Sequence, residues 1–157
     1  GTMNNFTFGN DRHQYYETIA GGSGAGPDHD GTSAVQTHMT NSRLTDPEVF
    51  ETRLPVLLES FSIRKGSGGT GAHHGGDGTV RRVRFLEAMR ANMLANRRKI
   101  APRGIAGGGD AKPGANYVLR TDGTREDLPA TAAADLAPGD VYVVETPGGG
   151  GYGEADK

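Results

Sequence analysis

Glycine gathers in four patches of this chain, which cover residues 21–26, 66–78, 104–109 and 148–153. It accounts for 26 of the 157 residues, a share well above the usual level of about 7%. The glycines follow no three-residue repeat, which excludes a collagen triple helix. The patches are therefore predicted to be long loops between short segments of regular structure.

The segments between the patches have the residue pattern of β-strands. Residues 55–65 alternate along an extended chain, and residues 140–147 form a run rich in β-branched side chains. Residues 115–129 hold Asp122 and Gly123 at their centre, a pair that is typical of a tight hairpin turn. These segments predict antiparallel strands joined by short turns.

Two further segments have a less regular pattern. In residues 79–87 the alternation is broken, because Arg81 would share a face with Val83 and Phe85. Residues 87–99 carry methionine and leucine at a helical spacing, but their polar positions also suit a strand. We favour a strand for both segments.

Signals for helices are few. Residues 45–48, with the sequence TDPE, are typical of a helix start, and Pro55 ends the segment, so one short helix is predicted over residues 47–53. The predicted fold class is mainly β, with antiparallel strands in a sandwich or a barrel, glycine-rich loops and one or two short helices. Residues 1–157 are expected to form a single domain with a frayed tail at residues 154–157.

Composition excludes several classes of protein. The formal net charge is −2, so no basic surface indicates nucleic-acid binding. The chain contains no cysteine, which excludes disulfides and thiolate metal sites and favours a cytoplasmic location. No apolar run approaches the ~18–20 residues of a membrane-spanning helix, and no signal peptide is evident. Because the chain begins with Gly1 in the middle of a pattern, we expect a piece of a longer protein, the alternative being a leftover tag residue.

One stretch, YYETIAGGSGAGPDHDG at residues 15–31, places unprotected backbone between two kinds of ionisable group. Glu17 lies in a strand-forming run before the glycines, and Asp28, His29 and Asp30 follow them. A turn follows GGSGAG in place of the helix that a dinucleotide-binding fingerprint requires. The chain also lacks the G-x-x-x-x-G-K-[ST] sequence of a phosphate-binding loop. Neither nucleotide site is therefore predicted, and the ionisable groups are candidates for acid–base chemistry.

The glycines of this stretch have two interpretations. They can serve sharp turns and bulges that require a positive φ, and the residues alone favour this interpretation. Alternatively, they can allow close approach of the backbone to a ligand or another chain, with N–H groups free to bind an oxyanion.

A second stretch, VQTHMTNSR at residues 35–43, brings an imidazole, an amide and a guanidinium close together. On a strand, His38 would point to one face, with Asn41 and Arg43 following at the strand end. Such groups can hold a carboxylate or an oxyanion and move a proton. The alternative is a polar strand end with a turn at Asn41.

Metal binding finds little support in the sequence. His29, His38, His73 and His74 show none of the spacings of known zinc motifs, and no metal site is predicted within this chain. The basic run at residues 96–99 is expected to be a solvated strand end or a partner for carboxylates.

A series of longer segments occurs in a fixed order over nearly the whole chain: GTMNNFTFGN, YYETIAGGSGAG, DHDG, THMTNSR, DPEVFETRLPV, RKGSGGTGAHHGGDG, ANRRK, GIAGGG and LAPGDVYVVETPGGGGYG. Taken together, these segments resemble the carboxy-terminal part of the hydantoinase B/5-oxoprolinase family. Any one glycine segment would be a weak signal, but the set is specific.

The resemblance implies an enzyme that uses ATP to open a cyclic amide, such as 5-oxoproline or a hydantoin. In this family an A-type partner subunit or domain, with an actin-like ATPase fold, phosphorylates the amide oxygen. The B-type part then hydrolyses the activated ring. ATP and a divalent metal are expected to bind outside this chain, in the partner and in the amino-terminal part of the B-type chain.

The resemblance also directs attention to particular residues. Glu17, His38 and Asp30 are the candidate catalytic residues, with Glu17 as a base or as a group that orients water. We expect Glu17 and His38 to lie close to Asn41 and Arg43, on a surface that faces the partner or the rest of the chain.

Four residues are candidates for binding the substrate. Asn41 and Arg43 would hold its carboxylate or phosphate, and the backbone of Gly22 and Gly24 would approach the developing negative charge.

Two departures from the family pattern and two alternatives accompany these assignments. His74 stands where the family has arginine, and Ser42 stands where threonine is usual. The chain is alternatively a structural domain that assembles the complex, or a fragment of an enzyme related to acetone carboxylase, which carboxylates ketones.

Overall fold

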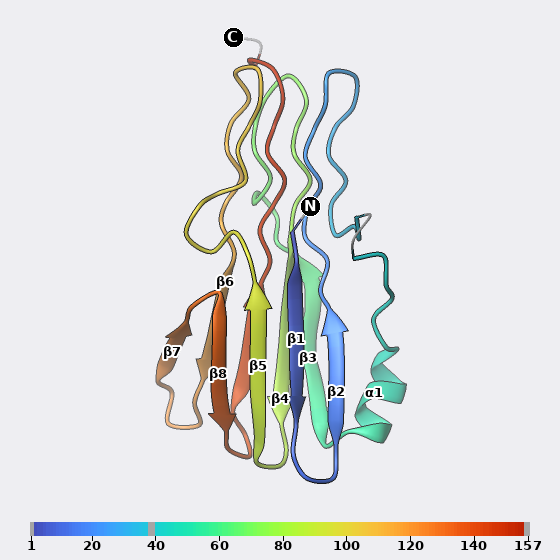
Figure 1. The fold of residues 1–157 in the computed structure, drawn as a ribbon, viewed down its shortest axis with the longest axis vertical. Helices are drawn as coiled ribbons and strands as arrows, with labels where there is room; N and C mark the ends of the chain where they lie inside the picture. The colour runs from blue at the N-terminus through green and yellow to red at the C-terminus, as the bar shows by residue number, and fades with distance from the viewer. Residues whose placement is uncertain (1, 38–39, 156–157) are drawn as a thin grey trace.

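The computed structural model describes residues 2–37 and 40–155, which form two antiparallel sheets and one short helix. Figure 1 shows the sheets at one end of an elongated molecule and the glycine-rich loops extending together at the other. The first sheet has the strand order β2-β1-β5-β8, and the second has the order β3-β4-β9-β6-β7. In chain order the elements are β1 (Asn4–Gly9), β2 (Gln14–Thr18), α1 (Pro47–Arg53), β3 (Val56–Ile63), β4 (Thr79–Phe85), β5 (Met89–Ala95), β6 (Ala115–Leu119), β7 (Arg125–Leu128), β8 (Thr131–Leu136) and β9 (Val141–Glu145).

The prediction of a mainly β fold is confirmed, and the two sheets form a sandwich. The helix starts where expected, because Asp46 Oδ1 accepts from Glu48 N at 3.0 Å and caps its N-terminus. The predicted hairpin forms as β6 and β7, with Gly123 at a φ of 86°. The ambiguous segment 87–99 contains a strand, β5. No helix in the described part of the chain is long and apolar enough to cross a membrane.

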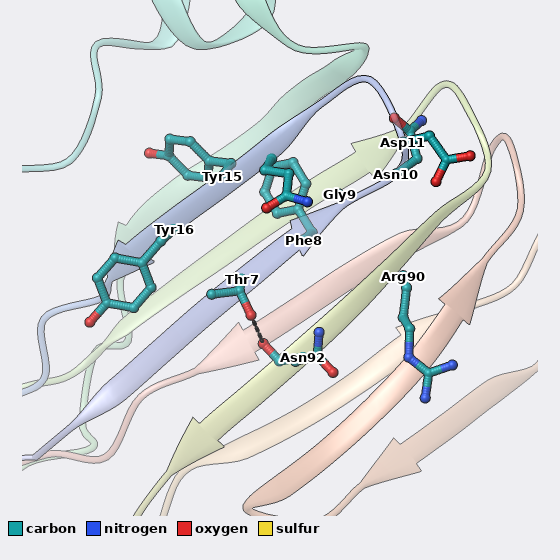
Figure 2. Close-up of a pocket in the computed structure, with 10 residues that line it drawn as sticks. Thr7, Phe8, Gly9, Asn10, Asp11, Tyr15, Tyr16, Arg90 and Asn92 are labelled. Carbon is teal, nitrogen blue, oxygen red and sulfur yellow. Dashed lines mark hydrogen bonds between the residues drawn. The ribbon is translucent and has the colours of Figure 1, made fainter.

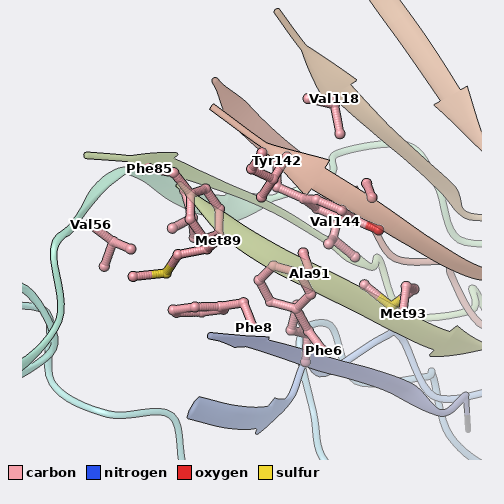
Figure 3. Close-up of a cluster of buried hydrophobic side chains, with 14 of the residues drawn as sticks. Phe6, Phe8, Val56, Phe85, Met89, Ala91, Met93, Val118, Tyr142 and Val144 are labelled. Atoms are coloured by element: carbon pink, nitrogen blue, oxygen red, sulfur yellow. The ribbon is translucent and has the colours of Figure 1, made fainter. Parts of the chain in front are cut away.

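The core between the two sheets consists of aromatic and aliphatic side chains (Figure 3). The ring centre of Phe6 lies 4.7 Å from that of Tyr142 in the opposite sheet, and the ring centre of Phe8 lies 5.0 Å from that of Phe85. Met89, Ala91 and Met93 of β5 belong to the same buried cluster. Burying a large apolar side chain contributes about 1.5–3 kcal/mol, so this layer is the main source of stability.

Two features of the second sheet concern its strands β4 and β3. Burial alternates regularly along β4, and Arg81 takes an inward position together with Val83 and Phe85. The alternation is therefore intact, and an arginine belongs to the interior. Strand β3 shifts its register against β4 between Leu58 and Ser60, which is a β-bulge or similar irregularity.

The basic run at residues 96–99 links the two sheets through Arg98. Its Nη1 donates to Asn4 Oδ1 of β1 at 2.6 Å, and its Nη2 donates to Asn116 Oδ1 of β6 at 2.7 Å. Burial lowers the pKa of Arg98 to about 10. The expectation of a solvated or carboxylate-paired side chain is wrong for Arg98, because it donates to the amide oxygens of Asn4 and Asn116 and to the backbone oxygen of Asn96.

The glycine-rich loops lie side by side and bond to one another through their backbones (Figure 1). Segment 148–153 makes backbone bonds to each of the other three loops. The bonds include Gly149 N to Gly76 O at 2.8 Å, Gly69 N to Gly149 O at 2.9 Å, Ala25 N to Gly150 O at 2.9 Å, Ile105 N to Gly151 O at 2.9 Å and Gly151 N to Gly109 O at 3.0 Å. We call this assembly of the four loops the glycine bundle.

Most glycines of the bundle are required by the packing of backbone on backbone. A Cβ atom added at Gly149 would lie 1.8 Å from Ser23 O, and one added at Gly22 would lie 1.9 Å from Gly76 O. Among the glycines of the described patches, a positive φ occurs at Gly66, Gly107 and Gly153. The interpretation as turns with a positive φ is therefore wrong at most positions. The backbone does make a close approach, but to other loops of the same chain.

The Asp77 carboxylate accepts hydrogen bonds from backbone N–H groups at the start of loop 66–78. Its Oδ1 accepts from Ser67 N at 2.8 Å and from Gly68 N at 2.7 Å, and its Oδ2 accepts from Gly66 N at 3.2 Å. Partial burial acts to raise the pKa of Asp77, but these N–H donors outweigh it, and the pKa lies below its ordinary value.

Replacing Asp77 with asparagine is expected to lower the free energy of unfolding near neutral pH. Because the folded-state pKa lies below the unfolded-state value, the carboxylate's contribution is present above about pH 4 and is lost as the pH falls through the folded-state pKa. The difference in unfolding free energy between wild type and Asp77→Asn, measured with urea, should therefore shrink toward acid pH. Asp11→Asn, in the exposed turn after β1, is the control. A difference that stays constant over the whole pH range would contradict this role.

Candidate functional site

Glu17, the candidate catalytic base on β2, is buried between the two sheets. Its carboxylate accepts two bonds from Arg81 of β4, with Nε 2.7 Å from Oε1 and Nη2 2.9 Å from Oε2. The exposed fraction is 2% for the Arg81 side chain and 1% for that of Glu17. The Arg81 guanidinium also lies 5.3 Å from the ring centres of both Phe50 and Phe61. The pair thus joins strands of opposite sheets and is closed off from solvent.

This geometry bears on what Glu17 can do chemically. Both of its oxygens accept from a guanidinium, and the Tyr15 hydroxyl adds a bond to Oε2 at 3.1 Å. A general base must come within hydrogen-bond reach of the proton that it abstracts, and this carboxylate offers no open side to water. The arrangement suits an anchor between the sheets better than a base.

The other residues of the expected cluster lie in the segment that leads to α1. Asn41 and Arg43 are exposed, and in the part of the chain that the structure describes no hydrogen bond or ion pair joins either of them to Glu17. His38 lies outside the described residues. The clustering of these four side chains therefore stays a prediction.

Gly22 and Gly24 differ in their surroundings within the glycine bundle. Gly22 N donates to Pro147 O at 3.1 Å, so this N–H is already paired. A Cβ atom added at Gly24 would meet nothing closer than Gly150 O at 3.8 Å. Gly24 therefore has the open surroundings that a binding role requires, whereas Gly22 serves the packing of the loops.

Asp30 lies exposed at the outer turn of its glycine-rich loop. Its Oδ1 accepts from His74 N at 2.7 Å, and His73 Nδ1 lies 3.5 Å from the same oxygen. A second acid–imidazole pair lies nearby in sequence, with Asp28 Oδ1 2.8 Å from His29 Nδ1. Loop 66–78 of the bundle and the residues that directly follow loop 21–26 thus present carboxylates and imidazoles on an exposed surface, and these are the groups that proton transfer requires.

The described residues do not form a metal site. Among residues 2–37 and 40–155, no group of three or more histidine, cysteine, aspartate or glutamate side chains could hold a metal ion. The divalent metal that the family resemblance implies is expected outside this chain, and we derive no step through one. The contact between His74 and Asp30 uses the backbone N–H of His74, so the arginine that the family resemblance leads us to expect at this position could make the same contact.

A family model described as hydantoinase B/oxoprolinase matches residues 1–155 of the chain. The chain belongs to the hydantoinase B/oxoprolinase family. The protein named 5-oxoprolinase 1 from Arabidopsis thaliana is 50% identical over 98% of this chain. The 5-oxoprolinase from Dictyostelium discoideum is 47% identical over all of it. This chain spans 12% of the length of either relative.

Solved structures share the fold of this hydantoinase B/oxoprolinase family member. A nucleotide-free acetone carboxylase superimposes with a TM-score of 0.76 at 18% identity, over 98% of this chain and 25% of that chain. An ATP-dependent caprolactamase from Pseudomonas jessenii superimposes with a TM-score of 0.73 at 24% identity, over 97% of this chain and 28% of that chain. At these identities the likeness shows a common fold alone.

A surface hollow of about 560 Å³ lies apart from the family's glycine-rich segments, on the outer face of the first sheet (Figure 2). Thr7, Tyr16 and Asn92 line it, together with charged Asp11 and Arg90. Hydroxyls and amides dominate this lining, and none of the candidate site residues belongs to it. The hollow offers hydrogen bonds but no acid–imidazole pair, so it is not the candidate site of this family member.

Sequence reasoning missed Arg81 and Tyr15 as partners of Glu17. A signal was present, because Arg81 shares a strand face with Val83 and Phe85, and a charged side chain at a buried position requires a partner. Glu17 is a carboxylate within a strand-forming run, and the sequence had indicated no partner for it. Pairing the two would have identified the anchor between the sheets.

Proposed function

We propose that this chain is the carboxy-terminal part of the B-type component of a cytoplasmic, ATP-dependent enzyme that opens the ring of 5-oxoproline. The single observation that carries the proposal is the 50% identity over 98% of the chain to a protein named 5-oxoprolinase. In this proposal an A-type partner phosphorylates the amide oxygen, and the B-type component hydrolyses the activated ring. The use of ATP is in keeping with the names of the caprolactamase and the acetone carboxylase that share the fold.

Hydrolysis of the activated ring needs a base near the exposed surface of the glycine bundle. The attacking water loses a proton as it adds to the ring carbon, and the C–N bond then breaks as the ring nitrogen takes up a proton. The acyl phosphate formed in this way is hydrolysed by a second water to the carboxylate and inorganic phosphate. We assign the base to Asp30, because its carboxylate is exposed, is held by the His74 N–H and lies beside the His73 imidazole. Asn41 and Arg43 are exposed and chemically suited to hold the substrate's carboxylate or its phosphate.

Replacing Asp30 with asparagine is expected to lower turnover by about a hundredfold, within the usual contribution of a general base. Asparagine keeps an oxygen that can accept from His74 N, so the loop should retain its conformation. The matched control is Asp28→Asn, which removes the neighbouring exposed carboxylate that pairs with His29. The measurement is kcat of the assembled enzyme, and the control should keep full turnover. An equal loss in both variants, or no loss in either, would contradict the assignment.

The proposed function is tested by measuring two products in one assay. The purified protein, assembled with its A-type partner, is supplied with ATP and 5-oxoproline, and glutamate and inorganic phosphate are followed together. We expect glutamate and inorganic phosphate to form in equal amounts. Without ATP no ring opening should occur, and without 5-oxoproline no coupled phosphate release should occur. Hydantoin and acetone with bicarbonate are the comparison substrates. Turnover of acetone without ring opening of any cyclic amide would assign the chain to a carboxylase.

A second function, that of an assembly domain, is favoured by the way the interior is built. The Glu17–Arg81 pair ties the sheets together, and the glycine loops interlock through backbone bonds. A rigid body of this kind is suited to holding a partner. In that case Asp30→Asn would keep full turnover.

A further inference from the structure

Strand β2 holds both ends of the segment at residues 36–45. At the start of the segment, Gln36 Nε2 donates to Thr18 O at 2.6 Å. At its end, Thr45 Oγ1 lies 3.0 Å from the Tyr15 hydroxyl. Tyr15 and Thr18 both belong to β2, so one strand of the sandwich holds the segment at two points.

Between these two points the described residues bond within the segment. Thr40 N donates to Thr37 O at 2.9 Å, and Ser42 N donates to Thr40 O at 2.7 Å. Thr40 is buried, whereas Asn41 and Arg43 are exposed. The direction in which the exposed side chains face therefore depends on where β2 holds the two ends.

The hydroxyl of Tyr15 is well suited to hold one end. A phenol has one proton, and the Glu17 carboxylate is the stronger acceptor, so Tyr15 donates to Glu17 and accepts from the Thr45 hydroxyl. Burial raises the pKa of Tyr15, and the nearby Glu17 carboxylate raises it further. The phenol therefore stays protonated and keeps both bonds at neutral pH.

The ring of Tyr15 also packs against two other aromatic rings. Its centre lies 5.2 Å from that of Phe8 in β1 and 5.0 Å from that of Phe50 in α1. Thr45 directly precedes Asp46, the residue that caps α1. The buried Glu17–Arg81 pair, Tyr15 and Thr45 thus form a continuous chain of contacts from the interior to the segment.

We propose that Tyr15 is a positioning residue: supported by the Glu17–Arg81 pair, it fixes Thr45 and thereby sets where Asn41 and Arg43 face. The structural part of the proposal stands on the contacts alone. Its consequence for substrate binding rests on the proposed function.

The structural part is tested by limited proteolysis of the purified protein with trypsin. Removing the hydroxyl in Tyr15→Phe should release Thr45 and speed cleavage after the exposed Arg43 by about tenfold, as expected for the loss of a hydrogen-bonding group next to a charge. The matched control is Tyr16→Phe, which removes a hydroxyl that bonds to Asn5 and Thr18. The control should leave the rate at Arg43 unchanged.

A second variant separates the local effect from general unfolding. Thr45→Val removes the other half of the same contact, so it should reproduce the effect of Tyr15→Phe, and the double variant should show no further increase. Cleavage after Arg125, in exposed β7, reports unfolding of the whole protein and should stay constant. Unchanged cleavage at Arg43 in Tyr15→Phe, equal acceleration at Arg125, or additive effects in the double variant would each overturn the proposal.

The consequence for substrate binding is measured in the assembled enzyme. Tyr15→Phe should raise KM for 5-oxoproline by about tenfold with little change in kcat, because the substrate-binding side chains lose their direction while the base is untouched. Tyr16→Phe should leave both constants unchanged. If the enzyme acts on another substrate, the proteolysis result stands and only this readout fails. Faster cleavage at Arg43 with an unchanged KM for a turned-over substrate would overturn the link to binding.

Discussion

Glutamine in place of Glu17 is expected to lower the free energy of unfolding by about 3–5 kcal/mol, because it leaves the buried Arg81 guanidinium without a countercharge. The two side chains are 1% and 2% exposed, so water cannot replace the lost partner. Urea unfolding of the purified variant and wild type measures the difference. The same substitution should leave turnover per folded molecule nearly unchanged, since Glu17 has no open side for a reacting water.

Two further variants make this result specific. Glu87→Gln removes a carboxylate that pairs with Arg12 at 2.6 Å on the surface, and it should cost less than about 1 kcal/mol. Adding Arg81→Met to Glu17→Gln should recover much of the lost stability, because no unpaired charge then remains in the interior. Unchanged stability of Glu17→Gln, together with a hundredfold loss of turnover, would show that Glu17 is a base after all.

Alanine in place of Gly22 is expected to disrupt the glycine bundle and to lower the free energy of unfolding by about 3 kcal/mol, the upper end of the usual cost of overpacking. The added Cβ would lie 1.9 Å from Gly76 O, a backbone atom that cannot move without displacing its own loop. The matched control is Gly24→Ala, two residues away, where the nearest atom would be Gly150 O at 3.8 Å. The control should be nearly neutral for stability.

The same pair of variants separates packing from binding. If Gly24 contributes to the substrate site, Gly24→Ala should alter KM while the unfolding curve stays in place. Equal stability of Gly22→Ala and Gly24→Ala, measured by urea unfolding, would contradict the close packing of the loops.

The strands and the helix were predictable because their signals are local. The TDPE sequence before α1 caps a helix within four residues, and Asp122-Gly123 sets a hairpin within its own turn. The residue patterns of segments 55–65, 115–129 and 140–147 predicted strands without any knowledge of their neighbours, whereas no strand was predicted at β8.

The contacts that define the candidate site could not be found in this way. Glu17 and Arg81 are 64 residues apart in sequence, and Asp30 and His74 are 44 residues apart. Turn glycines and packing glycines look alike in a sequence, because the close approach at Gly22 depends on where loop 66–78 lies. The family resemblance directed attention to these segments, but it does not distinguish an anchor from a base.

The most direct measurement compares Asp30→Asn and Glu17→Gln in the assembled enzyme, with ring opening of 5-oxoproline scaled to the amount of folded protein. We expect Asp30→Asn to lose about a hundredfold in turnover at unchanged stability. We expect Glu17→Gln to lose stability and to keep its turnover per folded molecule. The reverse result, with full turnover in Asp30→Asn and a hundredfold loss in a stable Glu17→Gln, would contradict the assignment of the base to the glycine bundle and of the anchor to the buried pair.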